Sequence, residues 1–258
     1  MYQNIQVYIQ EQIGVIEIYR EEVLNALNNE CILDIRDALY SFKYDDEVRV
    51  VIIKGSGDKA FAAGADIEEL QHLDHLDVMT NEGIHDLLNE LETFEKPTIA
   101  MVNGFALGGG CELTLACDIR IASNNAKFGL PELNLGIIPG AGGTQRLLQH
   151  IGLGNTLYLI FTGNMVDAAT AQQMGLVSAV VNQQELEKET FNIAKKIISK
   201  GPVATKFAKL AIKSQSRAAL QNSLLIEKLA QSVLFATQDK QEGMEAFFKK
   251  RKPEFKNQ

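Results

Sequence analysis

Gly104-Phe-Ala-Leu-Gly-Gly-Gly-Cys-Glu112 and Leu130-Pro-Glu-Leu-Asn-Leu-Gly-Ile-Ile-Pro-Gly-Ala-Gly-Gly-Thr-Gln145 are two glycine-rich turns, each of which carries a glutamate. Glycine lets a backbone approach a ligand without a Cβ in the way, and a glycine run that opens a helix directs unpaired N–H groups at whatever lies there. Such a turn suits an oxyanion. The two glutamates, Glu112 and Glu132, supply an acid and a base for a reaction at a carbonyl substrate.

The composition sets the class of protein and excludes several partners. The 258 residues are 46% hydrophobic and 22% charged, as in an ordinary soluble globular protein, and the net charge of -8 argues against general nucleic-acid binding. No apolar run approaches the ~20 residues that cross a bilayer, and the first residues lack the pattern of a signal peptide. We therefore expect a cytoplasmic protein with neither nucleic acid nor a membrane as partner. Three cysteines form no even disulfide framework and indicate reduced thiols: Cys31, Cys111 and Cys117.

Strand and helix patterns alternate along the first part of the chain. The expected strands are 5–9 and 15–19 (a hairpin), 48–53, 98–102 and 118–122, and the expected helices are 29–43, one starting near Asp66, 80–94 and 109–117. Repeated strand, turn and helix units predict an α/β fold with sites where strands give way to helix N-termini. Residues 184–250 indicate helices only, broken at Gly201-Pro202, near Ser216 and at 237–239. This C-terminal helical region is expected to pack on the core or on a neighbouring subunit.

Several familiar sites are excluded by spacing. The chain has no P-loop and no Gly-x-Ser-x-Gly elbow, and Gln145 stands where a dinucleotide fingerprint has its last glycine. The four histidines lack zincin spacing, and the pair His72 and His75 favours a solvated surface over a metal site. Cys111 beside Glu112 favours buried packing over nucleophilic catalysis.

The glycine turns also have a plainer interpretation. Gly108-Gly-Gly110 could simply let a strand and a helix pack closely, and a lone Glu112 is more often a solvated helix residue. The neighbours of Glu112 favour the functional interpretation, because they are apolar: Leu107, Cys111, Leu113, Leu115 and Ala116. A buried carboxylate without a task is costly.

Five segments together resemble the crotonase superfamily, most closely the enoyl-CoA hydratases. They are Phe61-Ala-Ala-Gly-Ala-Asp-Ile67, Lys96-Pro-Thr-Ile-Ala-Met-Val-Asn-Gly104, Ala106-Leu-Gly-Gly-Gly-Cys-Glu-Leu113, Phe128-Gly-Leu-Pro-Glu132 and Gly136-Ile-Ile-Pro-Gly-Ala-Gly-Gly-Thr-Gln-Arg146. The resemblance extends over nearly the whole chain. It implies an α/β crotonase-like spiral of β-β-α units in residues 1–183, containing the CoA-thioester site. Residues 184–258 would then serve oligomerisation and closure of the CoA pocket.

The resemblance assigns roles to individual residues. The backbone N–H groups of Ala65 and Gly109 would form an oxyanion hole for the thioester carbonyl, and Gly140 would help to place a water molecule. Glu132 would exchange the proton at the α-carbon, while Glu112 activates the water that adds to the β-carbon. Isomerases of the family commonly keep only one of the two glutamates. Two carboxyls that share one water cannot both ionise freely, so we expect a coupled pair with one raised pKa.

Recognition of coenzyme A is expected from turns in the first half of the chain and from a basic segment near its C-terminal end. The resemblance places Ala63, Asp66, Ile67 and Gly108 in substrate-binding turns, with backbone groups near Ala63 and Ala65 for the adenine. Lys250, within Lys249-Lys-Arg-Lys252, is the candidate for the CoA phosphates, and the alternative is a basic helix end that faces solvent. The family often has a lysine where this chain has Glu68, so a basic contact from that turn is not expected.

The predicted activity is the reversible addition of water to a 2-trans-enoyl-CoA, giving a 3-hydroxyacyl-CoA, as in fatty acid β-oxidation. The resemblance implies a hydro-lyase that needs no metal and no cofactor beyond the CoA of its substrate, assembled as a homotrimer or as a homohexamer built from two trimers. One alternative is another CoA-thioester reaction of the family, such as double-bond isomerisation. A second is a CoA-binding homologue without turnover.

Overall fold

The computed structural model describes residues 2–80, 83–214 and 217–256. The strands are β1 (Ile5–Gln10), β2 (Ile13–Ile18), β3 (Val50–Gly55), β4 (Ala60–Ala62), β5 (Thr98–Val102), β6 (Phe105–Leu107), β7 (Ile119–Ser123), β8 (Lys127–Gly129), β9 (Val166–Asp167) and β10 (Ala179–Val181). The α-helices are α1 (Asn29–Tyr44), α2 (Ile67–His72), α3 (His75–Thr80), α4 (Ile84–Thr93), α5 (Gly109–Ala116), α6 (Gly143–Thr162), α7 (Ala168–Gln173), α8 (Leu186–Ile198), α9 (Pro202–Ser214), α10 (Arg217–Phe235) and α11 (Gln238–Phe248). The short 3₁₀ helices in the described ranges are η1 (Glu21–Val23), η2 (Glu132–Leu135) and η3 (Gln183–Glu185).

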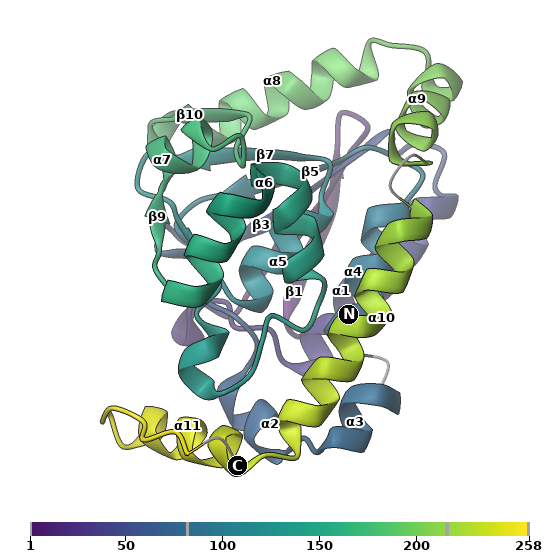
Figure 1. The fold of residues 1–258 in the computed structure, drawn as a ribbon. Helices are drawn as coiled ribbons and strands as arrows, with labels where there is room; N and C mark the ends of the chain where they lie inside the picture. The colour runs from purple at the N-terminus through teal and green to yellow at the C-terminus, as the bar shows by residue number, and fades with distance from the viewer. Residues whose placement is uncertain (1, 81–82, 215–216, 257–258) are drawn as a thin grey trace.

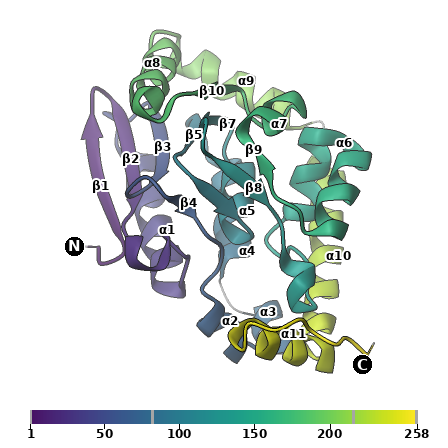
Figure 2. The ribbon, with the colours of Figure 1, turned by 90° about the vertical axis from the view of Figure 1, so that its left-hand side faces the viewer.

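Two sheets form the centre of the molecule (Figures 1 and 2). The larger has the order β1-β2-β3-β5-β7-β10, in which only the β1–β2 pair is antiparallel. The smaller has the order β4-β6-β8-β9, with parallel pairing up to β8 and an antiparallel β8–β9 pair. Successive strands of the chain thus alternate between the two sheets from β3 to β8, so the chain winds as a spiral.

The local elements follow from the residue patterns. The expected hairpin is present, and its two-residue turn places Glu11 and Gln12 at positive φ, as a tight turn between twisted strands requires. The continuous apolar run in β3 is buried on both faces, as expected for an interior parallel strand. Asn28 and Asp66 cap the N-termini of α1 and α2 through side-chain oxygens.

Several boundaries differ from those predicted. The helix expected over 80–94 begins at Ile84, with α3 as a separate helix before it, and residues 81–82 lie outside the described residues. Between β5 and α5 the chain forms the additional strand β6, which the pattern did not reveal because it has only three residues. The break expected near Ser216 also lies outside the described residues.

The described residues after η3 are helical or irregular, as predicted for the C-terminal part of the chain. Helix α10 lies beside α3 and α6, and α11 packs against η2, so these late helices lie next to elements from the middle of the chain (Figure 1). Within residues 2–80, 83–214 and 217–256, no helix combines the length and apolarity of a membrane span. The C-terminal helices therefore belong to the same body as the sheets.

Candidate active site

A cavity of about 770 Å³ opens between the N-terminal ends of α2 and α5, the η2 turn and α10. This volume is within the range of small-molecule sites. Its wall includes nine of the ten residues predicted from the sequence: Ala63, Ala65, Asp66, Ile67, Gly108, Gly109, Glu112, Glu132 and Gly140. Segments separated by up to 77 positions in the chain, from Ala63 to Gly140, therefore meet at one site.

Ala65 and Gly109 present backbone N–H groups at the centre of this wall. Gly109 is the first residue of α5, and a Cβ added to it would come within 3.3 Å of the Ala65 nitrogen, so the two peptide groups are adjacent. Neither N–H has a hydrogen-bond acceptor among the described residues. Two unpaired, neighbouring donors at a helix N-terminus can stabilise a developing oxyanion.

The glycines that flank these donors have conformations that other residues rarely adopt. Gly64 has φ of +124° and Gly108 has φ of +49°, and a Cβ on Gly108 would lie 3.2 Å from Glu132 Oε1. The 63–66 turn is held by the chain after η1, because Leu27 N–H donates to the Gly64 carbonyl and Asp66 N–H donates to the Leu27 carbonyl. Backbone geometry therefore fixes the direction of the donors.

Glu112 lies in α5, a helix whose residues are all buried, and only 3% of its surface is exposed. Its Oε1 accepts hydrogen bonds from the N–H groups of Ala141 and Gly143, each at 2.8 Å. These donors belong to the turn that opens α6, so the charge-assisted bonds and the helix dipole favour the carboxylate form. The packing of Gly110 against Ala62 lets α5 enter the core, because a Cβ there would lie 2.0 Å from the Ala62 carbonyl oxygen.

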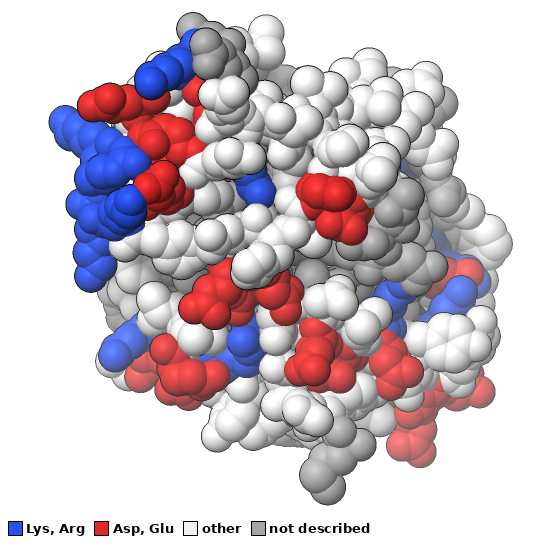
Figure 3. All heavy atoms as spheres, turned by 90° about the horizontal axis from the view of Figure 1, so that it is seen from below, with Lys and Arg blue, Asp and Glu red and all other residues white. Residues whose placement is uncertain are grey.

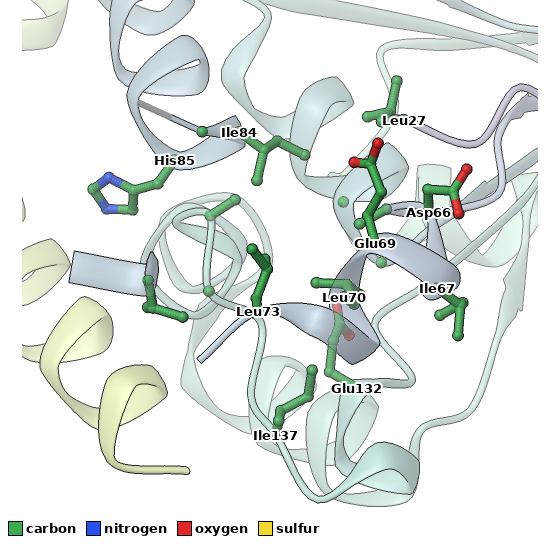
Figure 4. A pocket seen from close by; sticks show the side chains of 18 of the residues that line it. Leu27, Asp66, Ile67, Glu69, Leu70, Leu73, Ile84, His85, Glu132 and Ile137 are labelled. Carbon is green, nitrogen blue, oxygen red and sulfur yellow. The ribbon is translucent and has the colours of Figure 1, made fainter. Parts of the chain in front are cut away.

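Glu132 opens the η2 helix, and its side chain extends into the cavity that Leu70, Leu73 and Ile137 also line (Figure 4). Its Oε2 is buried without a hydrogen-bond partner among the described residues. An unpaired carboxyl oxygen in apolar surroundings favours the protonated form. Glu132 is therefore suited to hold a proton, and Glu112 is suited to accept one.

The electrostatics of the two carboxyls agree with the expectation of a coupled pair. Burial, followed by the charge of the nearby Glu227, raises the pKa of Glu112 to about 7. Burial, and then the charge of Glu112, raises the pKa of Glu132 well above its usual range. At neutral pH the pair can hold one proton between them, which is what reversible transfer of a proton needs.

Lys250 is the one predicted site residue that the structure does not bring to the cavity. It is exposed, follows α11 and has a positive φ. The face that includes α11 is seen in Figure 3, where Lys and Arg side chains gather along one edge. Two of the four basic residues in Lys249-Lys-Arg-Lys252 form ion pairs within the tail, since Lys249 pairs with Glu245 and Arg251 with Glu242. The contact of Lys250 with CoA stays a prediction.

The cavity also contains residues that the sequence did not indicate. Gln231 and Phe235 come from α10, more than 85 positions after Gly140, and both line the wall. Glu227, one turn before Gln231, is buried beside the same turn. The sequence pattern that identified Glu112 could also have found Glu227. In both places a carboxylate stands beside apolar residues, here in Leu224-Leu-Ile-Glu227.

The cysteines and histidines were interpreted correctly. Cys31, Cys111 and Cys117 are buried free thiols, and burial raises the pKa of Cys111. A thiol that resists ionisation is a poor nucleophile, which supports packing as its role. His72 and His75 are exposed.

Comparison with known proteins identifies the family of this chain. A model of the enoyl-CoA hydratase/isomerase family matches residues 8–258. The chain belongs to this family. It is 44% identical to the crotonyl-CoA hydratase of Syntrophomonas wolfei over 98% of both chains, and 43% identical to the short-chain-enoyl-CoA hydratase of Clostridium acetobutylicum over 95% of both. The crystal structure of an enoyl-CoA hydratase from Mycobacterium avium subsp. paratuberculosis has a TM-score of 0.89 at 31% identity, with full coverage of both chains.

These relatives confirm three predictions. The resemblance to the crotonase superfamily is correct, and the α/β spiral is the fold of the structural relatives. The relatives also support the activity class, an enoyl-CoA hydratase and hence a hydro-lyase. The roles of the individual residues stay predictions.

Proposed function

We propose that this chain hydrates short-chain trans-2-enoyl-CoA thioesters reversibly, with Glu112 as the base and Glu132 as the acid. The observation that carries the proposal is the pair of differently held carboxyls beside two unpaired backbone donors in one cavity. The names of the relatives from Syntrophomonas wolfei and Clostridium acetobutylicum favour short acyl chains. The family also includes isomerases, but the presence of both glutamates favours hydration.

The geometry supports a complete cycle of proton transfer. The thioester carbonyl accepts hydrogen bonds from Ala65 and Gly109 N–H, which polarises the conjugated double bond. Glu112 takes a proton from a water molecule while the oxygen of that water bonds to the β-carbon. The electron pair of the double bond then moves towards the thioester carbonyl and forms an enolate. The oxyanion hole stabilises the enolate, and Glu132 gives its proton to the α-carbon. The site then holds one proton, now on Glu112, and this proton returns to Glu132 before the next turnover. The reverse sequence is dehydration.

One end of the cavity is lined by apolar side chains and can hold the acyl chain of the substrate. The side chains there come from the α2–α3 segment on one side and from η2, its following turn and α10 on the other: Ile67, Leu70, Leu73, Val78, Leu135, Ile137 and Phe235. Burial of each methylene of an acyl chain contributes roughly 0.8 kcal/mol, so the depth of this end limits the chain length that binds well.

The remaining features belong to the same proposal. Lys250 contacts the CoA phosphates, and the helical residues 184–258 close the CoA pocket and contribute to a homotrimer or a homohexamer. The enzyme acts in the cytoplasm in fatty acid metabolism and uses no cofactor beyond the CoA of its substrate. The exposed apolar side chains of α10, such as Ile226 and Val233, support burial against another subunit.

Hydration of crotonyl-CoA tests the proposal directly, because addition of water removes the absorbance of the conjugated enoyl thioester. We expect turnover by the wild-type protein and a loss of at least ~10²-fold in Glu112→Gln and in Glu132→Gln. Glu187→Gln is the matched control, since it makes the same change at an exposed position on α8. Wild-type turnover retained in either site variant would contradict the two-carboxyl mechanism.

A further inference from the structure

A third buried carboxylate, Glu227 of α10, lies on the turn that holds Glu112. Its Oε1 accepts a hydrogen bond from Gly142 N–H at 2.5 Å, and its Oε2 accepts one from Thr144 N–H at 3.0 Å and one from the Thr144 hydroxyl. Only 3% of the residue is exposed, and it is not part of the cavity wall. The three hydrogen bonds that the Glu227 carboxylate accepts therefore all come from this turn.

The two carboxylates bind alternate peptide groups of the turn. Glu112 accepts from residues 141 and 143, and Glu227 accepts from residues 142 and 144. Four consecutive backbone N–H groups are thus paired with two side chains, one from α5 and one from α10. Gln231, one turn further along α10, accepts from Ile138 N–H at 3.1 Å. The helix α10 therefore anchors both ends of residues 138–144.

One peptide group within this segment is left for a ligand. Pro139 has no N–H, and the N–H of Gly140 has no acceptor among the described residues. Gly140 is also packed against Gln231, because a Cβ there would lie 2.6 Å from Gln231 Nε2. The bonds to α10 thus determine where the Gly140 donor lies relative to Glu112.

Burial of Glu227 needs a compensating purpose. A buried carboxylate costs free energy unless it is fully hydrogen-bonded, and a like charge near Glu112 adds to that cost. A helix N-terminus could be capped by an uncharged serine or asparagine instead. The carboxylate combines two acceptor oxygens with a negative charge beside the base, which no neutral cap supplies.

We propose that Glu227 is a positioning residue for hydration: its carboxylate fixes the turn 140–144 so that Glu112 and the Gly140 N–H can both hydrogen-bond the same water molecule. The inference rests on the proposed function. Its charge also opposes ionisation of Glu112, which keeps that base strong enough to take a proton from water. Helix α10 thereby completes the active site without contacting the substrate through this residue.

Two variants separate the geometric and the electrostatic parts of this role. Glu227→Gln keeps the size but presents an NH₂ group to one of the two backbone donors and removes the charge. Glu227→Asp keeps the charge but is one methylene too short to reach both donors. We expect kcat for crotonyl-CoA to fall at least ~10-fold in each, with KM within about twofold of wild type, because the interaction acts on the reacting groups.

The pH profile distinguishes positioning from simple support of the fold. Removal of a like charge lowers the pKa of Glu112, so the acid limb of kcat should move to lower pH by about half a unit or more in Glu227→Gln. Glu227→Asp should move it less. Hydrogen exchange of the Ala141 and Gly143 amides should become faster in both variants, since their turn loses its second anchor.

Ala230→Gly is the control for a general weakening of α10, since it changes an exposed position of the same helix. It should leave kcat and the pH profile unchanged. The inference is overturned if Glu227→Gln matches Ala230→Gly in both measurements. If Glu227→Gln does not fold, Thr144→Val decides, because it removes the hydroxyl donor to Glu227, and Gln145→Ala is its control because it removes the bond that the same hydroxyl accepts from Gln145 Nε2. A several-fold loss of kcat supports the role, and wild-type kcat overturns it.

Failure of the proposed function would be recognised separately. A wild-type protein that binds butyryl-CoA in calorimetry but does not hydrate crotonyl-CoA would contradict the hydratase assignment. Hydrogen exchange of the turn in Glu227→Gln would still report whether the residue fixes residues 140–144. Unchanged exchange there, together with active wild-type enzyme and unchanged kcat in the variant, would contradict the positioning role alone.

Discussion

Replacement of Glu112 by glutamine should make the protein more stable at pH 8 and almost inactive. The carboxyl has an ordinary pKa of 4.5 and a pKa of about 7 in the folded protein, mainly because it is buried. A carboxyl with a raised pKa binds its proton more tightly in the folded state than in the unfolded state. The free energy of unfolding of the wild-type protein is therefore highest, as far as this group decides it, below pH 4.5, and it falls as the pH rises towards 7.

The size of this effect follows from the rise of the pKa from 4.5 to about 7, which corresponds to a free energy on the order of 3 kcal/mol at pH 8. Glutamine avoids this cost because it has no charge to bury. Its Oε1 can still accept from the N–H groups of Ala141 and Gly143, so the turn should keep its shape. The variant trades activity for stability.

Thermal unfolding at fixed protein concentration, at pH 8 and at pH 5, measures the gain. We expect a higher Tm for Glu112→Gln at pH 8 and most of the difference lost at pH 5, where the wild-type carboxyl is protonated in the folded state. Crotonyl-CoA turnover should fall at least ~10²-fold at both pH values. A variant less stable than wild type at pH 8, or a gain equal at both pH values, would refute the argument from burial of charge.

Three further outcomes follow from the site. Glu132→Gln should abolish exchange of the α-proton of the 3-hydroxyacyl product with deuterated water, and exchange at the wild-type rate would exclude Glu132 as the acid. Gly109→Val should abolish hydration activity while the circular dichroism spectrum stays unchanged, because its Cβ would lie 3.3 Å from the Ala65 nitrogen. Normal turnover in a folded variant would show that the oxyanion hole does not lie at Gly109. Lys240→Ala removes two hydrogen bonds to the carbonyls of Gln71 and Leu73, so KM should rise about threefold or more with little change in kcat. An unchanged KM would show that these bonds do not hold the α2–α3 wall of the cavity.

The sequence by itself determined the class of the fold and much of the site. Apolar runs such as 98–102 predicted buried strands, because a strand covered on both faces has no solvent side. The positions of Glu112 and Glu132 were identifiable because a charge among apolar residues is costly without a partner or a task. The glycines at 108–110 indicated a close backbone approach, and the structure places Gly109 beside Ala65.

Other features were decided only by the tertiary structure. The short strands β4, β6, β8 and β9 have too few residues to show a period, and their sheet exists because each pairs with a neighbour distant in the chain. Glu227 follows three apolar residues in the sequence, but nothing local to α10 shows that four backbone N–H groups of the distant turn 141–144 need two acceptors. Which N–H groups remain unpaired depends on every hydrogen bond made around them, and that balance is a property of the folded chain.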